Sequence, residues 1–381
     1  MRAARRLAVL ALLVAMAAAC APAPASPAAA PPGGAPAPAP SAAAPAPNGA
    51  LAELVEGARR EGQLNLVWSQ NTTGGAAAVR RWADGFNRYY GLALNVQFTP
   101  GPDMPQMAGR LAQQHQAGRT PDTDVFLGTE THVVLLMQAD ALAPVDWLAW
   151  APNVQDPRLL APGGVAVQVT ATMPGITYNT ARVGPDEVPT TLEALLQPRY
   201  KGRVASTPYA AIFDRLASPE LWGEARTVAY VSGLAEQISG LMRAGEVERI
   251  AGGEFDLLAI NTNSSDALAW QARGAPAAHV VPADAAVVQY RYLGVPRLAA
   301  HPNAARLWIN YLLSREAQDI LFEVGYSDHY LLPGAKTAGA IEALQAQGVH
   351  FTPIDVQFVQ RNDEEALSRV RDELQRLLQK R

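Results

Sequence analysis

The chain has 381 residues, of which 49% are hydrophobic, and a formal net charge of −4. A chain of this length can bury one large hydrophobic core or, more often, two. Its Lys and Arg residues do not gather into a basic stripe, which argues against a nucleic-acid partner.

The first twenty residues have the pattern of a secretory signal peptide. Arg2, Arg5 and Arg6 give a positive start, Leu7 to Met16 form a short apolar segment, and small residues lead to Cys20. The apolar segment is too short and wrongly flanked for a stable membrane span, so an uncleaved anchor is the less favoured alternative. We expect the chain to be exported to the periplasm or the cell surface.

Cys20 is the only cysteine of the chain. Its position resembles that in a bacterial lipoprotein signal, in which the cysteine becomes the lipid-modified first residue. The pattern departs at Ala17, where such signals usually carry Leu. A single cysteine excludes an intrachain disulfide. We therefore expect residues 1–20 to be a lipoprotein signal peptide and Cys20 to anchor the protein to a membrane.

Residues 21–50 are predicted to be a disordered tether. They consist almost wholly of Ala and Pro, with no aromatic residue and no apolar periodicity. Such a segment cannot offset the entropy lost on ordering, and its proline content favours a semi-rigid polyproline character. The folded part is expected to begin near Leu51.

Beyond the tether, helical and strand patterns alternate along a first block. The predicted helices are 51–61, 76–90, 104–117 and 131–139, and the predicted strands are 64–68, 92–98 and 123–127. Strands that alternate with helices of about ten to fifteen residues imply an α/β fold with a mostly parallel sheet and helices on both faces.

A second block follows, and the chain then returns to the first. The predicted strands are 165–170, 175–179, 203–206, 255–260, 279–281 and 287–292, and the predicted helices are 192–196, 211–216, 219–232, 238–244, 302–313 and 316–324. A last helix, 364–378, carries apolar residues at spacings of three and four, which is typical of an amphipathic surface helix. A coiled-coil partner is the alternative, but the apolar stripe is too short to favour it.

Five segments in this order carry a resemblance to a known family. They are GQLNLVWSQNTTG (62–74), TPDTDVFLGTETHVVLLMQADALAPV (120–145), GEFDLLAINTNSSDALAWQARG (253–274), HPNAARLWINYLLSREAQDIL (301–321) and TPIDVQFVQRNDEEALSRVRDELQRLL (352–378). Together they resemble an extracellular solute-binding protein of an ATP-binding-cassette importer, of the group that includes ferric-iron-binding proteins. The resemblance covers nearly all of the predicted folded part.

The resemblance implies a two-lobe periplasmic-binding-protein fold of type II. Such proteins have two α/β lobes joined by crossing strands and close on a ligand held in the cleft between them. Lobe 1 would comprise 51–169 and 285–381, and lobe 2 would comprise 170–284. The candidate crossings are 170–174 and 283–289. The implied partners are a small ligand and the transmembrane subunits of a permease, with the protein itself a monomer without cofactor.

Four strand-to-helix junctions are rich in uncharged hydrogen-bonding side chains. An ordinary N-cap explains any one of them. Four at the carboxyl ends of strands predict a ligand cleft, because loops meet unpaired helix N–H groups there. The candidate ligand-binding residues are Trp68, Ser69, Asn71, Thr72, Thr73, Thr129, Glu130, Ser206, Thr207, Tyr209, Thr262, Asn263 and Ser264, with Tyr290 and Arg291 on the return strand.

These residue types suit a small anion or a polar, hydroxylated molecule. Helix N-termini and hydroxyl groups can bind an anion without formal charge, and Arg291 is a candidate partner for one. Trp68 and Tyr209 are candidate apolar walls, with core packing an equal alternative.

Ferric-binding relatives hold iron with two adjacent tyrosines, and many add a histidine and a glutamate. The resemblance places the tyrosine pair at Asn263 and Ser264, the histidine near Thr72 and the glutamate near Glu130. A neutral amide and a hydroxyl cannot replace two phenolates as ligands of ferric ion. Iron binding through an atypical site is therefore the alternative, and no metal ligand is predicted.

The remaining patterns favour a carrier over an enzyme. Tyr89 and Tyr90 end a predicted helix, where packing explains them better than metal binding. The sequence contains no G-x-S-x-G, P-loop or HExxH motif, and no cysteine nucleophile besides Cys20. We therefore expect a substrate-binding lipoprotein of an importer that captures a small polar or anionic solute. A periplasmic hydrolase and a purely structural or adhesive lipoprotein are the less favoured alternatives.

Overall fold

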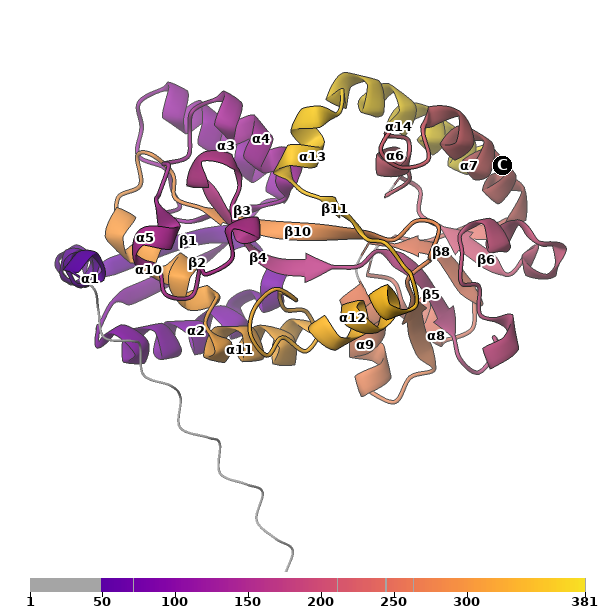
Figure 1. Ribbon diagram of the computed structural model, residues 1–381, viewed down its shortest axis with the longest axis horizontal. Coiled ribbons are helices and arrows are strands. Elements are labelled where there is room, and N and C mark those ends of the chain that lie inside the picture. The colour runs from indigo at the N-terminus through magenta and orange to yellow at the C-terminus, as the bar shows by residue number, and fades with distance from the viewer. Residues whose placement is uncertain (1–48, 71, 211, 244, 263, 381) are drawn as a thin grey trace, which may run out of the picture. The chain divides into compact units, whose positions relative to one another are not determined.

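The computed structural model describes residues 49–380 apart from Asn71, Ala211, Ala244 and Asn263 (Figure 1). The predicted signal peptide, Cys20 and nearly all of the predicted tether lie outside these residues. The described helices are α1 Gly49–Glu61, α2 Gly75–Tyr90, α3 Met104–Gln116, α4 Glu130–Gln138, α5 Trp147–Trp150, α6 Phe213–Leu216, α7 Glu224–Gln237, α8 Glu248–Ala251, α9 Ser264–Ala272, α10 Pro302–Leu312, α11 Arg315–Gly325, α12 Ala338–Ala346, α13 Val356–Arg361 and α14 Glu364–Gln379. The described strands are β1 Gln63–Ser69, β2 Asn95–Gly101, β3 Phe126–Gly128, β4 Ala166–Thr172, β5 Gly175–Asn179, β6 Val204–Ser206, β7 Ile238–Leu241, β8 Leu257–Asn261, β9 Ala277–Val280, β10 Val287–Gly294 and β11 Thr352–Ile354.

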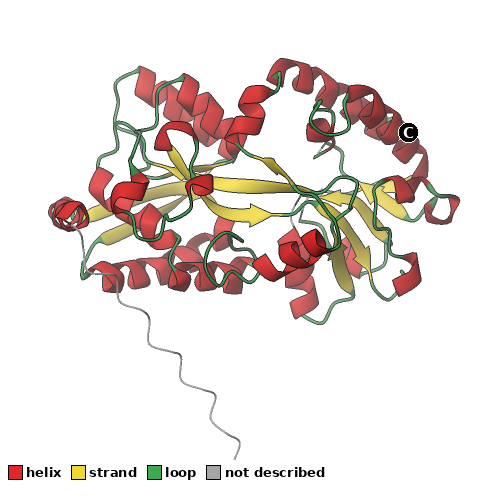
Figure 2. Ribbon diagram, in the orientation of Figure 1, coloured by secondary structure: helices red, strands yellow, loops and turns green. Residues whose placement is uncertain are grey.

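The strands form two lobes of α/β structure (Figure 2). In the first lobe β1 pairs with β2, while β10 pairs with β3, β4 and β11. In the second lobe the strand order is β7-β6-β8-β5-β9. Helices flank the strands on both sides in each lobe (Figure 2). The α/β fold with two lobes predicted from the sequence is therefore confirmed.

The sheets are mixed, which differs from the mostly parallel sheet expected from the sequence. β1–β2, β6–β7, β6–β8 and β10–β11 are parallel, whereas β10–β3, β10–β4, β5–β8 and β5–β9 are antiparallel. In the first lobe the reason is the path of the chain, since β10 enters this lobe from the second and so runs against β3 and β4.

The crossings between the lobes lie on β4 and β10. β4 ends at Thr172 in the first lobe, and β5 begins at Gly175 in the second, so the chain changes sheet within the predicted segment 170–174. The return runs from the end of β9 to the start of β10, across the predicted segment 283–289. In Figure 1 the long strand β10 lies beside β4 and extends toward the second sheet.

The C-terminal helix packs on the second lobe, although the sequence analysis placed residues 285–381 in the first. The apolar stripe of α14, with Leu367, Val370, Leu374 and Leu378, is buried in the same core as the strands β5, β6 and β8. The helix lies along α6 and α7 (Figure 1). Its amphipathic character is as predicted, but the lobe that it covers is set by its contacts with α6 and α7.

The sequence predicts a helix at 238–244, and this prediction is wrong. Residues Ile238–Leu241 form β7, an edge strand parallel to β6. A Cβ atom built on Gly240 would lie 2.1 Å from the ring of Phe255, so the absent side chain allows this strand to pack closely. The contact of Gly240 with Phe255 thus favours a strand over the helix that the sequence pattern predicts.

No helix of the described chain combines the length and apolar character that a membrane span requires.

Candidate functional site

The junction between β3 and α4 places polar groups at a helix start. The Thr129 amide donates to His132 Nδ1 at 3.1 Å, and the Thr129 hydroxyl lies 3.0 Å from the same nitrogen. Burial lowers the pKa of His132 to about 4, with the positive charge of Arg291 adding to the effect. The imidazole is therefore neutral at physiological pH and acts as an acceptor that closes the first turn of α4.

Glu130, the first residue of α4, is a buried carboxyl group with an unused oxygen. Its side chain is only 3% exposed, and Oε2 has no hydrogen-bond partner among the described residues. Burial raises the pKa of Glu130, while the positive charges of Arg215 and Arg291 oppose that rise. A buried carboxyl oxygen without a hydrogen-bond partner raises the free energy of the folded protein unless another group binds it.

Arg215 reaches α4 from α6 of the second lobe. It donates to the Thr131 hydroxyl at 2.9 Å and to Glu364 of α14 at 2.9 Å, and it lies 4.0 Å from Glu130. Only 7% of Arg215 is exposed. This guanidinium therefore connects the first turn of α4 to the second lobe.

Further ion pairs hold Arg215 in place. Arg371 of α14 pairs with Asp214 at 2.7 Å and with Glu364 at 3.1 Å. We refer to Glu130, Asp214, Arg215, Glu364 and Arg371 as the interlobe ion cluster. The sequence analysis found Glu130 alone, because the other members come from helices whose spacing carries no local sign of the cluster.

Arg291 lies on β10 in register with Thr170 of β4. The next residue, Tyr292, pairs with Gly128, which comes two residues before the start of α4, so Arg291 lies beside that helix start. Burial lowers the pKa of Arg291. The residue is half-buried, and among the described residues it has neither an ion pair nor a hydrogen-bond acceptor.

Tyr290 lies on the opposite face of β10 from Arg291, because successive side chains of a strand alternate. The Tyr292 ring lies with it, at a centroid distance of 6.3 Å, although the pairing of β10 with β4 shifts register between Arg291 and Tyr292. The Tyr290 ring stacks on His329, with centroids 5.6 Å apart, and its hydroxyl lies 3.3 Å from that of Tyr330. Tyr290 thus has contacts within the first lobe, and the role of Tyr290 and Arg291 in binding stays a prediction.

The end of β6 supplies a second buried polar group without a partner. Ser206 is fully buried, and its hydroxyl has no hydrogen-bond partner among the described residues. The neighbouring Thr207 hydroxyl donates to the Tyr209 carbonyl oxygen at 2.6 Å, which shapes the turn before α6. Tyr209 itself is half-buried. Ser206 thus keeps its predicted status as a candidate, whereas Thr207 has a local structural contact.

The end of β8 is the stretch NTNSSD. Asn261 is buried, and its amide donates to the Thr177 hydroxyl at 3.3 Å. Thr262 is half-buried, and Ser264 is the first residue of α9. Asn263 lies outside the described residues. Thr262 and Ser264 stand at a strand-to-helix junction as expected, and their role in binding stays a prediction.

At the end of β1 the first candidate is a core residue. Trp68 is 1% exposed, and its indole donates to the Val125 carbonyl oxygen at 2.8 Å, so it packs in the first lobe and is no ligand wall. The Ser69 hydroxyl donates to the Pro102 carbonyl oxygen at 2.8 Å. Thr73 has a left-handed backbone with φ of 52°, in a short 3₁₀ segment that begins at Thr72. Asn71 lies outside the described residues.

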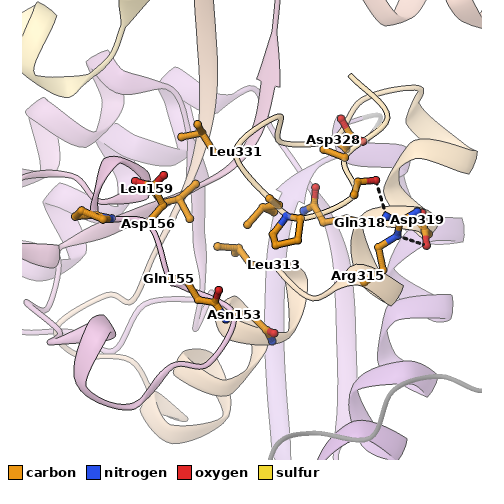
Figure 3. Close-up of a pocket in the computed structure, with 15 residues that line it drawn as sticks. Asn153, Gln155, Asp156, Leu159, Leu313, Arg315, Gln318, Asp319, Asp328 and Leu331 are labelled. Carbon is orange, nitrogen blue, oxygen red and sulfur yellow. Dashed lines mark hydrogen bonds and ion pairs between the residues drawn. The ribbon is translucent and has the colours of Figure 1, made fainter. Parts of the chain in front are cut away.

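The hollow drawn in Figure 3, with a volume of about 610 Å³, lies elsewhere in the first lobe. Its polar side chains already have partners within the protein. Arg315 binds Asp319 at 2.8 Å, Gln318 donates to Val169 and Leu312, and Asn153 donates to Asn310. These contacts hold the walls together, which makes the hollow a weak candidate for ligand binding.

A second hollow, of about 480 Å³, lies on the Tyr290 side of β10. Tyr292, Tyr330 and Gln168 also line it. Arg291 and Glu130 line neither hollow.

Metal ligation has little support in the described residues. No group of three or more His, Cys, Asp or Glu side chains there is arranged to hold a metal ion. Tyr90 accepts from Asn310 Nδ2 at 2.6 Å and packs edge-on against Tyr89. The predicted packing role of this tyrosine pair is confirmed.

Comparisons with known proteins agree with the fold. Residues 81–352 match the model of the family described as bacterial extracellular solute-binding protein. The chain is 28% identical over 159 residues to an Fe(3+)-binding periplasmic protein of Serratia marcescens, a match covering 41% of this chain and 45% of that protein.

Solved structures of similar fold extend over most of the chain. The substrate-binding protein of an ABC transporter from Agrobacterium tumefaciens has a TM-score of 0.67 at 18% identity, covering 83% of this chain and 94% of that one. The apo ferric ion-binding protein A of Pasteurella haemolytica has a TM-score of 0.64 at 18% identity, covering 82% and 98%. At these identities the likeness shows the fold alone.

Proposed function

Because the chain belongs to the bacterial extracellular solute-binding protein family, we propose that it is the solute receptor of an ABC importer and that it binds a small polar or anionic solute beside Arg291. Membership of the family implies that the protein is exported and binds a solute for transport. The importer, the site and the chemical class of the solute are the parts that we propose.

The observation that carries the site is the unpartnered guanidinium of Arg291. Removing an arginine from water costs several kcal/mol unless acceptors replace the lost hydration, on the order of the penalty for other buried ions. Arg291 is half-buried and has no such acceptor among the described residues, whereas the more deeply buried Arg215 has Thr131 and Glu364. A carboxylate, phosphonate or similar group of a solute would supply it through charge-assisted hydrogen bonds.

Neighbouring polar groups suit the same role. Glu130 offers a free carboxyl oxygen near Arg291, and Ser206 offers a free hydroxyl in the second lobe. A solute that contacts residues of both lobes binds the closed arrangement better than the open one and so shifts the population toward closure. Thr129, Thr262 and Ser264 are further candidates for such contacts.

The delivery of the solute follows from the same proposal. We expect lipid attached to Cys20 to hold the receptor at the membrane, the tether 21–50 to give it reach, and the permease to bind the loaded monomer. No catalytic role is proposed. Replacement Cys20→Ser should release the exported protein from the membrane fraction, as measured by fractionation and mass spectrometry of the first peptide.

The experiment that tests the site combines a ligand screen with one substitution. Shifts in melting temperature would be measured against organic acids, phosphonates, amines, sugars and metals. For the best ligand, Arg291→Met should weaken binding by at least about 30-fold, the effect expected for removal of a buried charged partner, without lowering the melting temperature of the free protein. Arg158→Met, which removes an exposed arginine paired with Asp156, is the control. Equal affinities of wild-type and Arg291→Met protein would refute the site.

Ferric ion is the second candidate solute, and the name of the Serratia relative favours it. Among the predicted ligand-binding residues that the structure describes and brings near Arg291, Glu130 alone has an anionic side chain. Ferric citrate and ferric nitrilotriacetate in the same screen, with Glu130→Gln as the variant, would test iron directly. A melting shift with these salts that Glu130→Gln abolishes would favour iron over an organic solute.

A further inference from the structure

The first crossing between the lobes consists of two residues. β4 ends at Thr172 and β5 begins at Gly175, so only Met173 and Pro174 join the two sheets here. Pairing with β10 holds β4, and pairing with β8 and β9 holds β5. The proline ring fixes φ of Pro174. A change in the angle between the lobes therefore falls mainly on the backbone of Met173 at this crossing, because hinges are a few residues at the ends of elements.

A histidine of the second lobe holds the Met173 carbonyl group. Nε2 of His279, on β9, lies 3.0 Å from the Met173 carbonyl oxygen, and this nitrogen carries the proton because a carbonyl oxygen can only accept. A Cβ atom built on Gly175 would lie 2.8 Å from the same nitrogen, so the absent side chain leaves room for the ring. Because ψ of Met173 sets the direction of this carbonyl group, the hydrogen bond restricts the dihedral angle that the hinge uses.

The same histidine connects to the β8–α9 junction through two side chains. Burial lowers the pKa of His279 to about 4, so the ring is neutral and its Nδ1 accepts. The Thr177 hydroxyl lies 3.3 Å from Nδ1 and donates to it, and it accepts from the Asn261 amide at 3.3 Å. Thr177 and Asn261 are both buried, and Asn261 directly precedes Thr262 of the junction. We refer to Asn261, Thr177, His279 and the Met173 carbonyl group as the hinge network.

We propose that Thr177 and His279 are positioning residues for closure, which couple the β8–α9 junction to the angle between the lobes. The inference rests on the proposed function, from which it takes that the lobes close and that the junction contacts the solute. A solute that binds Thr262 moves the neighbouring Asn261. The movement reaches the Met173 carbonyl group, because a broken hydrogen bond within the network would leave a buried polar group unsatisfied.

Coupling and plain stabilisation differ in where a broken hydrogen bond has its effect. A network that only stabilises the second lobe protects β5 and β9, and its loss changes those strands alone. A network that couples two sites also changes the crossing and the separation of the lobes when it is broken near the junction. Both effects can be measured without solute, since every member of the network belongs to the chain itself.

Hydrogen exchange of the free protein, followed by mass spectrometry, tests the network at its two ends. Thr177→Val removes the central hydroxyl and should speed exchange in both segments 170–174 and 261–266 by at least about five-fold. His279→Asn keeps a polar group opposite Thr177 but is too short to reach Met173, so exchange should rise in segment 170–174 alone. Small-angle X-ray scattering should show that both variants change the radius of gyration in the same direction. The double variant should change it no more than the larger single change, because both substitutions break one network.

Two variants control for a general loss of stability. Thr227→Val also removes a buried hydroxyl of the second lobe, which donates to the Gly223 carbonyl oxygen at 2.9 Å outside the network. Exchange in both segments and the radius of gyration should stay as in the wild type for this variant. Thr177→Ser keeps the hydroxyl and should keep the wild-type values, which separates the hydrogen bonds of Thr177 from the packing of its methyl group.

The outcomes separate this inference from the proposed function. Faster exchange confined to β5 and β9, an equal rise in Thr227→Val, or an unchanged radius of gyration in both network variants would overturn the coupling. None of these results bears on whether a solute binds, which the melting screen tests. A screen that finds no ligand would count against the receptor role and would leave the coupling measured in the free protein intact.

Discussion

The two faces of β10 differ in how their polar groups are satisfied. On one face, Gln168 donates to the Tyr292 hydroxyl at 3.1 Å and lies 2.9 Å from His329 Nε2, and Tyr290 and Tyr330 share a hydrogen bond. On the other face, Arg291 lies near Glu130 without a direct partner, although it is the immediate neighbour of Tyr290 in sequence.

The difference shows how to tell a structural polar group from a binding group. Buried polar groups that satisfy one another stabilise the fold, and those left unsatisfied cost free energy until something binds them. The face with Gln168 and His329 is structural by this criterion, and the face with Arg291 and Glu130 is the candidate site. The same criterion separates Arg215, which is paired, from Arg291.

The largest effect is expected at the paired arginine. Arg215→Met should lower the free energy of unfolding by about 3–5 kcal/mol, because it leaves buried carboxylates without their cation. Chemical denaturation would measure it. The control Arg361→Met removes an exposed pair with Glu220 and should cost at most about 1 kcal/mol. If both variants lose the same small amount, the distinction between paired and unpaired groups fails.

Substitutions on the face with Gln168 and His329 should lower stability and leave ligand binding nearly unchanged. Gln168→Met should lower the free energy of unfolding by about 2–4 kcal/mol, because the Tyr292 hydroxyl and His329 Nε2–H lose a buried partner. Affinity for the solute should change by less than about two-fold, since the opposite face of the strand is untouched. A large loss of affinity at unchanged stability would place the ligand on this face instead.

The same face also predicts a dependence on pH. Burial lowers the pKa of His329 to about 3, whereas histidine in an unfolded chain titrates near 6.5. Between these values the unfolded state binds the proton and the folded state does not, so this contribution to stability is lost as the pH falls.

The measurement is the slope of stability against pH between about 6 and 4. His329→Gln should reduce that slope by up to about 1.4 kcal/mol per pH unit. The exposed His350 provides the control His350→Gln, for which the slope should stay as in the wild type. An unchanged slope in His329→Gln would mean that the buried ring is already protonated.

The smallest change in stability is expected at an unpartnered group. Ser206→Ala should alter the free energy of unfolding by no more than about 0.5 kcal/mol, and in the stabilising direction, because a buried hydroxyl without a partner is removed. Affinity should fall by about five-fold or more if that hydroxyl binds the solute. Loss of stability without loss of affinity would assign Ser206 to the structural class.

The fold was largely predictable because periodicity and turn residues act locally. Most helices and strands of both lobes lie within a few residues of their predicted ranges, and the resemblance indicated the order of elements. The strand β7 was missed, since the close packing of Gly240 on Phe255 has no signature in its own segment. The placement of α14 was missed because an apolar stripe specifies that a helix is covered and not what covers it.

For this protein, the sequence by itself determined the α/β class, the two lobes, the polar junctions at strand ends and Arg291 as a candidate for an anion. Tertiary structure decided which of these groups are satisfied. It buried Trp68 in the core, separated Tyr290 from Arg291 across a strand, and brought Arg215 and Glu364 from distant helices to Glu130. Satisfaction of a polar group depends on partners far away in sequence, and these partners become neighbours only when the chain has folded.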